Sequence, residues 1–168
     1  FVRCFMRLNL KNIIEVPGGS VSFETDLDTE NLDFPGVESY KTVPHASGRV
    51  YNRAGIIEMS GLLQCEMQCI CDRCGNLYDC TKQTSLDAEL TTEPEPEDPM
   101  LFSIEGDEVD LDEILTTLFI LDMESKHVCK EDCKGLCCRC GKNLNDGPCG
   151  CQKEKDPRFA VLEQLLDK

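Results

Sequence analysis

The 168-residue sequence lacks any apolar run of about 18 residues or more, the length that a helix needs to cross a bilayer. We also expect no secretory leader, because the opening FVRCFMRLNLKN contains neither an extended apolar stretch nor a small-residue cleavage site. Both absences predict a cytoplasmic protein that makes no membrane contact. Phe1 cannot be a start residue, and we expect Met6 to be the native start.

The sequence motifs of common enzyme classes are missing as well. The chain contains no Walker A sequence, no G-x-G-x-x-G and no H-E-x-x-H. Nothing in the sequence specifies a cysteine–histidine pair for nucleophilic catalysis. We therefore expect no catalytic residues and a protein that is not an enzyme. A thiol-dependent redox enzyme is the weakest of the alternatives considered.

Basic residues are scarce, since 17 Lys+Arg against 32 Asp+Glu give a formal net charge of −15. Residues 1–124 hold 8 Lys+Arg and 25 Asp+Glu, whereas residues 125–168 hold 9 and 7. An acidic surface of this kind repels a phosphate backbone. We expect the acidic body to meet a basic protein, and any contact with RNA to be made by the C-terminal part.

The first ninety residues alternate between apolar and polar side chains, as half-buried strands do. The alternation is visible over residues 21–28 and again from Ile57 to Cys71, where the odd positions are mostly apolar. Ala54-Gly55 and residues 73–76 are expected to turn hairpins, and the Pro- and Gly-containing stretch 33–48 is expected to be turns and loop. Residues 1–92 are thus predicted to form an antiparallel β domain.

The rest of the chain is predicted to contain, in order, an acidic Pro-rich loop, a helix packed on the sheet, a cysteine-rich zinc module and a C-terminal helix. Their expected bounds are 93–108, 109–124, 125–155 and 156–168. The first helix has an apolar stripe and a capping box formed by Asp110 and Glu113. The predicted fold class is α+β: an antiparallel sheet or meander with a packed helix, and a cysteine-rich zinc-binding module that ends in a helix.

Thiols are abundant, and seven of the 13 cysteines lie in residues 129–151. Disulfides are rare in the cytosol and an odd count cannot pair fully, so metal binding is the better interpretation. The spacings are C-x3-C, C-x2-C-G and C-x-C, which suit a structural zinc ion held by sulfur alone. The candidate ligands are Cys129, Cys133, Cys137, Cys140, Cys149 and Cys151.

The ligand set within this group stays open. The favoured arrangement is one ion on Cys137 and Cys140 with two of the other four candidates. A binuclear cluster of all six is one alternative. A second is a pair of separate four-cysteine sites, in which Cys71 and Cys74 of the hairpin supply the missing two ligands. For that hairpin pair, packing and metal binding are equally good interpretations.

The other thiols and the nearby histidine are given structural roles. Cys65, Cys69 and Cys80 lie on strand faces and are expected in the core, and Cys138 is the extra thiol of the tail. His127 lies two residues before the first tail ligand; it could itself be a ligand, but it is expected to face solvent.

Four segments together resemble one known family. They are CDRCGNLYDC, VDLDEILTTLFILDM, CKEDCKGLCCRCGKNLNDGPCGC and DPRFAVLEQL, in that order. This combination is similar to the YceD family of large ribosomal RNA subunit accumulation proteins, over nearly the whole chain. The chain departs from the family at Cys138, where proline is usual, and at Gly75-Asn76, where leucine is expected.

The resemblance implies a non-enzymatic role in ribosome biogenesis, supporting accumulation or assembly of the large ribosomal subunit and its large rRNA. The implied partners are a large-subunit precursor or a basic ribosomal or assembly protein. With the acidic body, this favours a protein adaptor braced by a structural zinc site. The alternative is a zinc module that binds ribosomal RNA directly.

Overall fold

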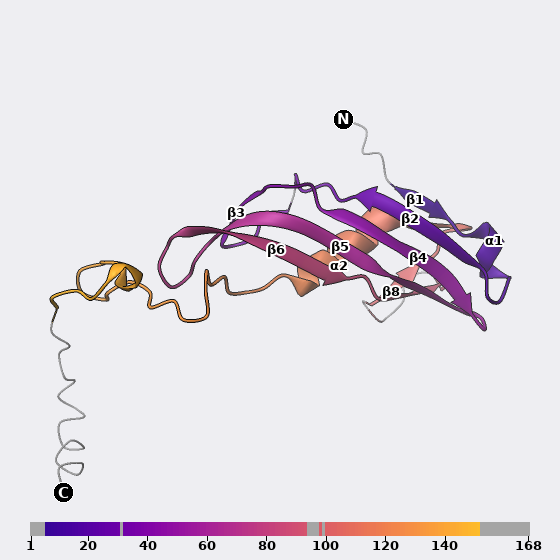
Figure 1. Cartoon of the computed structure of the whole chain (residues 1–168). Coiled ribbons are helices and arrows are strands. Elements are labelled where there is room, and N and C mark those ends of the chain that lie inside the picture. Colours follow the sequence, from indigo (N-terminus) through magenta and orange to yellow (C-terminus); the bar gives the residue numbers. More distant parts are fainter. Residues whose placement is uncertain (1–5, 31, 94–97, 99, 152–168) are drawn as a thin grey trace, which may run out of the picture.

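The computed structural model describes residues 6–30, 32–93, 98 and 100–151, and this part of the chain is mostly β-sheet with few helices (Figure 1). The elements are β1 Arg7–Asn9, α1 Lys11–Ile14, β2 Ser20–Asp26, β3 Val37–Tyr40, β4 His45–Arg53, β5 Ile56–Ile70, β6 Leu77–Ser85, β7 Ala88–Thr91, β8 Leu101–Ser103, β9 Glu108–Asp110, α2 Leu111–Asp122 and the 3-10 turn η1 Leu144–Asp146. None of the helices in this part of the chain has the length and apolar character required to span a bilayer.

The main sheet has seven strands and is organised by the 15-residue strand β5. One edge of β5 pairs with β4 and β3, and the other pairs with β7 and β6, all antiparallel. β2 extends the sheet beyond β4, and β8 extends it beyond β7 in the parallel direction. β1 and β9 form a separate two-stranded sheet. At about 3.3 Å per residue, β5 is roughly 50 Å long and runs through the whole body.

The predicted turn at Ala54-Gly55 joins β4 to β5. Both residues have positive φ, 54° and 99°, which matches the twist of a two-residue hairpin. Asn52 is buried and stabilises this end of the sheet, since its side chain accepts from Gly55 N at 2.8 Å. The same side chain donates to the carbonyls of Ile13 and Ile14 at 2.8 and 2.7 Å, which ties α1 to the sheet.

One face of the sheet is covered by α2 (Figure 1), and the core lies between them. The residues predicted for the apolar stripe of this helix are all buried: Leu111, Ile114, Leu115, Leu118 and Phe119. Phe119 contacts Phe34 edge-to-face at a centroid distance of 5.8 Å. Asp110 caps the helix by accepting from Glu113 N at 3.2 Å. The opposite face of the sheet carries the polar positions of β2, β4 and β5.

Lys82 is a buried cation on the covered face of β6. Its Nζ lies 2.9 Å from Asp122 Oδ2 and 3.0 Å from Glu124 Oε1, at the C-terminal end of α2. Burial alone would lower the pKa of Lys82, but these two carboxylates raise it. Lys82 and Thr84 are both buried although neither is apolar. The alternation of buried and exposed positions along β6 therefore continues through them. The ion pair fastens the end of the helix to the sheet.

The structure differs from the sequence-based expectation at several short elements. The stretch 33–48, expected as turns and loop, contains β3 and the start of β4. The range 93–108, expected as a loop, contains β8 and the first residue of β9. The predicted strand through Leu90 is divided into β6 and β7. The helix predicted over 156–168 lies outside the described residues.

Candidate metal centres

Eight cysteines of the described residues form two groups of four. We call the first group the hairpin tetrad, and it consists of Cys71, Cys74, Cys129 and Cys133. We call the second group the tail tetrad, and it consists of Cys137, Cys140, Cys149 and Cys151. Within each tetrad the sulfur atoms all lie within 4.8 Å of one another. Three members of the hairpin tetrad are buried, whereas the tail tetrad is half-buried to exposed.

The first half of the hairpin tetrad is a tight turn between β5 and β6. Cys71 N donates to Asn76 O at 2.9 Å, and Gly75 N donates to Cys71 O at 2.8 Å. Gly75 has φ +71°, a conformation that favours glycine. The turn aims the sulfurs of Cys71 and Cys74 at the same point, which is how a zinc knuckle presents two ligands.

The tail tetrad begins with a second turn of the same construction. Cys137 N donates to Lys142 O at 2.8 Å, and Gly141 N donates to Cys137 O at 2.9 Å. Gly141 also has φ +71°. The sequences of the two turns, CDRCG and CCRCG, share C-x-R-C-G. The chain therefore builds the same two-sulfur knuckle twice.

The two middle residues of the hairpin knuckle attach the tail to the body. Asp72 exchanges backbone-directed hydrogen bonds with His127: Asp72 N donates to His127 O at 2.8 Å, and His127 N donates to Asp72 Oδ2 at 2.7 Å. Arg73 Nη1 donates to the carbonyls of Glu131 and Cys133 at 2.9 and 3.1 Å. These contacts bring the second pair of ligands against the hairpin.

Two asparagines in the loop between Cys140 and Cys149 connect this loop to the hairpin tetrad. Asn143 Oδ1 accepts from the backbone and side-chain nitrogens of Asn145, at 2.9 and 2.8 Å, and so caps η1. Asn145 Nδ2 also donates to Cys133 Sγ at 3.3 Å, while its Oδ1 accepts from Lys134 N at 2.9 Å. The Asn-Leu-Asn of the sequence thus contributes a direct hydrogen bond to a sulfur of the hairpin tetrad.

The hairpin tetrad stabilises thiolate at particular sulfurs. Burial raises the pKa of Cys71, but backbone N–H groups of Cys129, Cys74 and Arg73 lower it to about 6. The hydrogen bond from Asn145 lowers the pKa of Cys133. Burial raises the pKa of Cys129 to about 12. Four thiols this close cannot all ionise without a neutralising cation, so protons are retained on some while others are poised as ligands.

The tail tetrad shows the same division. Backbone N–H groups of Cys140 and Arg139 lower the pKa of Cys137 to about 6. The neighbouring Cys140 side chain raises the pKa of Cys151 to about 12. In both tetrads the pKa of the first cysteine of the knuckle is lowered to about 6, because its sulfur accepts from the backbone of the turn.

The sulfur geometry fits a tetrahedral metal ion. Zn–S bonds of about 2.3 Å place the corners of a tetrahedron roughly 3.8 Å apart. The hairpin tetrad has Sγ–Sγ distances of 3.9 Å between Cys71 and Cys133 and 3.8 Å between Cys74 and Cys129. In the tail tetrad, Cys137 and Cys149 are 3.3 Å apart, which is somewhat closer. Each tetrad could hold one metal ion, and its donors are all sulfur.

The six candidate ligands of the tail do not gather at one point. Four of them form the tail tetrad, while Cys129 and Cys133 turn back to the hairpin and join Cys71 and Cys74. This grouping corresponds to the alternative of two separate four-cysteine sites that include Cys71 and Cys74, and not to the favoured arrangement of one site within the tail. Sequence spacing did not show which four ligands belong together, although the repeated C-x-R-C-G was a signal for two equivalent half-sites. Cys138 is exposed.

The thiols expected in the core are placed there or beside it. Cys65 and Cys69 are buried, and Cys80 is half-buried with its sulfur 3.2 Å from Cys69 Sγ. Cys4 lies outside the described residues. Cys65, Cys69 and Cys80 belong to neither tetrad.

The expectation that His127 faces solvent is wrong. Only 5% of the residue is exposed, and its ring packs under Gly36, where an added Cβ would lie 2.6 Å from His127 Cδ2. Its Nε2 is buried with no hydrogen-bond partner among the described residues. The ring fills space below the β3 end of the sheet, and its backbone rather than its imidazole binds the hairpin.

Comparisons with known proteins place these features in a family. The profile described as "Large ribosomal RNA subunit accumulation protein YceD" matches residues 59–166, a range that includes every cysteine of both tetrads. The Arabidopsis thaliana protein "Large ribosomal RNA subunit accumulation protein YCED homolog 1, chloroplastic" is 34% identical over 73 residues, which are 43% of this chain and 23% of that relative. The chain thus aligns with less than a quarter of that relative's length. No solved structure matches the chain. The chain belongs to the YceD family.

Proposed function

We propose that this protein is a non-enzymatic ribosome-biogenesis factor that supports the accumulation of the large rRNA and the assembly of the large ribosomal subunit. The observation that carries the proposal is the family match over residues 59–166. The site of action is the cytoplasm, where thiols stay reduced and free to bind metal.

The metal role within this function is structural. Each tetrad offers four sulfur ligands and therefore leaves no open position for a substrate or a reactive water. Zinc is the ion that best suits four thiolates in tetrahedral geometry. We assign one zinc ion to each tetrad, so that two ions replace the single ion favoured from the sequence alone. Bound zinc would hold the tail on the hairpin and keep the tail loop folded.

The acidic body suits a protein adaptor. Residues 1–124 contain 25 Asp+Glu against 8 Lys+Arg, so their surface attracts basic ribosomal or assembly proteins and resists general contact with RNA. A second candidate is direct rRNA binding through the tail. The basic residues Lys134, Arg139 and Lys142 lie within or close to the tail knuckle in the sequence and favour this candidate.

Depletion and sedimentation test the proposal. Loss of the protein is expected to lower the ratio of large to small rRNA, and the tagged full-length chain is expected to migrate with large-subunit precursors on a sucrose gradient. Migration with precursors should be lost at high salt, because the contact is electrostatic. Migration with the small subunit, or an unchanged rRNA ratio after depletion, would contradict the proposed role.

The adaptor and the RNA-binding tail are separated by charge reversal. The full-length double variant Lys134→Glu, Lys142→Glu changes the tail while leaving the acidic body intact. An adaptor that works through its body should still migrate with precursors, whereas a direct RNA-binding tail should be released. Cys138→Ser, at an exposed thiol outside both tetrads, serves as the control substitution in the same segment.

A further inference from the structure

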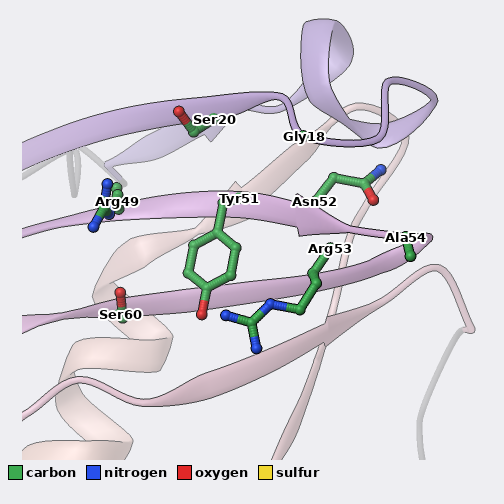
Figure 2. A pocket seen from close by; sticks show the side chains of 8 residues that line it. All are labelled: Gly18, Ser20, Arg49, Tyr51, Asn52, Arg53, Ala54 and Ser60. Carbon is green, nitrogen blue, oxygen red and sulfur yellow. The ribbon is translucent and has the colours of Figure 1, made fainter.

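The outer face of the main sheet, opposite α2, carries a basic hollow at the end furthest from the cysteines. Its volume is about 530 Å³, which lies within the range of ligand sites. The lining residues are Gly18, Ser20, Arg49, Tyr51, Asn52, Arg53, Ala54 and Ser60. No carboxylate is among them. Figure 2 shows Arg49, Tyr51 and Arg53 along one strand, with Tyr51 between the two arginines.

The register of the sheet creates the hollow. Arg49 lies between Ser22 of β2 and Ser60 of β5, and Tyr51 lies beside Ser20 of β2. Because the serines are short, the long side chains of β4 stand above their neighbours and leave open space beside them. The site therefore offers two guanidinium groups and several hydroxyls on a flat strand surface. This donor set suits an anion with several acceptor oxygens.

Charge on this face is segregated by position along the strands. At the other end of β4, His45 pairs with Glu24 and Asp26 of β2, at 3.3 and 2.7 Å. At the end near the β4–β5 turn, Arg53 Nε lies 3.7 Å from Glu58 Oε2, so that carboxylate is already paired. Arg49 has no ion pair among the described residues, whereas Arg7, Lys41 and Lys82 all do. Within the hollow, Arg49 is therefore a cation that is free to meet an anion.

Tyr51 adds an aromatic surface to the arginines. The Arg53 guanidinium lies 5.5 Å from the centre of the Tyr51 ring, a cation–π distance. The side-chain hydrogen bond to Glu58 raises the pKa of the Tyr51 hydroxyl, so this hydroxyl stays protonated at neutral pH. A half-buried ring fixed in this way can stack a base, and Arg49 on the same strand, which has no ion pair among the described residues, can meet a phosphate.

We propose that Arg49, Tyr51 and Arg53, which we call the β4 patch, bind the sugar–phosphate backbone and a base of single-stranded RNA. A carboxylate peptide would use the arginines but leave the aromatic ring without a function. This inference rests on the proposed role with rRNA and names a contact on the body rather than the tail. It also qualifies the expectation from net charge, because one basic patch can bind RNA locally while the surrounding acids restrict where the strand runs.

The test uses the full-length, zinc-loaded chain and a fluorescein-labelled dodecamer of uridine, followed by fluorescence anisotropy. Arg49→Gln is expected to weaken binding about 5-fold and to reduce the slope of log Kd against log salt by about 0.7, the value for one phosphate contact on a single strand. Tyr51→Leu should weaken binding by a similar factor without changing that slope, since stacking releases no counterion. Arg7→Gln removes one exposed arginine from β1 and is the matched control; it should change Kd less than 2-fold.

Three results would overturn the β4 patch as an RNA site: no binding of the dodecamer by the wild-type chain at 50 mM salt, equal losses in Arg49→Gln and Arg7→Gln, or unchanged binding in both patch variants. A glutamate dodecamer is the second probe, and equal, Arg49-dependent affinity for it would identify a carboxylate site instead. Sedimentation separates this inference from the proposed function. If the chain migrates with large-subunit precursors but does not bind the RNA dodecamer, the RNA site at the β4 patch is refuted while the proposed function stands.

Discussion

The two knuckles allow one substitution to be made at equivalent positions of both tetrads. Cys74→Ser and Cys140→Ser each remove the second cysteine of a C-x-R-C-G turn. We expect native mass spectrometry to find two zinc ions in the wild-type chain and one ion in each variant. Since the lost ligand is the same in both cases, differences between the variants report what each tetrad holds together.

The expected difference between the two variants follows from the length of the chain loop that each ion closes. The hairpin tetrad joins cysteines 55 and 62 residues apart, whereas Cys137 and Cys149 of the tail tetrad are 12 residues apart. Treated as cross-links, these closures are worth about 4 and about 3 kcal/mol. The first closure includes β6, β7 and α2, so its loss should lower the melting temperature of the sheet by roughly 8–16 °C. The second lies wholly in the tail and should leave sheet melting within about 2 °C.

Far-UV circular dichroism is the suitable readout for the sheet, because the chain has no tryptophan and only 3 tyrosines. The reasoning fails if wild-type protein holds a single ion, if Cys74→Ser retains both ions, or if the two variants lower the melting temperature of the sheet equally. The exposed Cys138→Ser should keep two ions and wild-type melting, which controls for the loss of a thiol as such.

Two further predictions concern the body. Lys82→Met should lower the free energy of unfolding by about 2 kcal/mol in urea at pH 7, because two carboxylates lose their buried partner. The pKa of Asp122 is lowered in the folded protein, so the stability that its ion pair contributes is present above its unfolded pKa and is lost as the pH falls through its folded pKa. The difference in unfolding free energy between wild type and Lys82→Met should therefore become smaller in acid. A difference that does not change with pH would contradict the pairing. Gly36→Ala should lower the free energy of unfolding by about 3 kcal/mol, since φ is +86° and the new Cβ would meet His127. Gly55→Ala, at φ +99° but with open space around the new Cβ, should lower it by about 1 kcal/mol. Equal losses at the two glycines would refute the packing of His127.

Periodic features of the fold were predictable from the sequence. β5 is long, and its apolar and polar residues alternate with the two-residue period of the pleat. Ile57, Met59 and Cys69 could therefore be assigned to the buried face. The stripe of α2 was readable for the same reason. The strands β8 and β9 have three residues each, too few for any period to appear, and their place is set by pairing with distant strands.

The candidate sites divide along a similar line. Each knuckle is local, so C-x-x-C-G could be recognised in the sequence. Which ligands complete each tetrad depends on the docking of the tail through Asp72 and Arg73, and this docking is a tertiary contact with no local pattern. His127 illustrates the same limit: its burial results from Gly36, which is remote in sequence. The β4 patch was not predicted because net charge averages over the whole chain and does not show where two arginines lie on the same strand face.

The separation of the tetrad ligands also affects when each candidate metal site can be completed during synthesis. The hairpin knuckle leaves the ribosome first, but it remains a half-site with two sulfurs until residues 129–133 emerge. The tail tetrad closes a much shorter loop and can fill as soon as Cys151 is free. Completion of the hairpin tetrad requires both the finished sheet and the tail. Under the proposed zinc assignment, attachment of the tail to the body is therefore expected to depend on the zinc supply as well as on completion of the sheet.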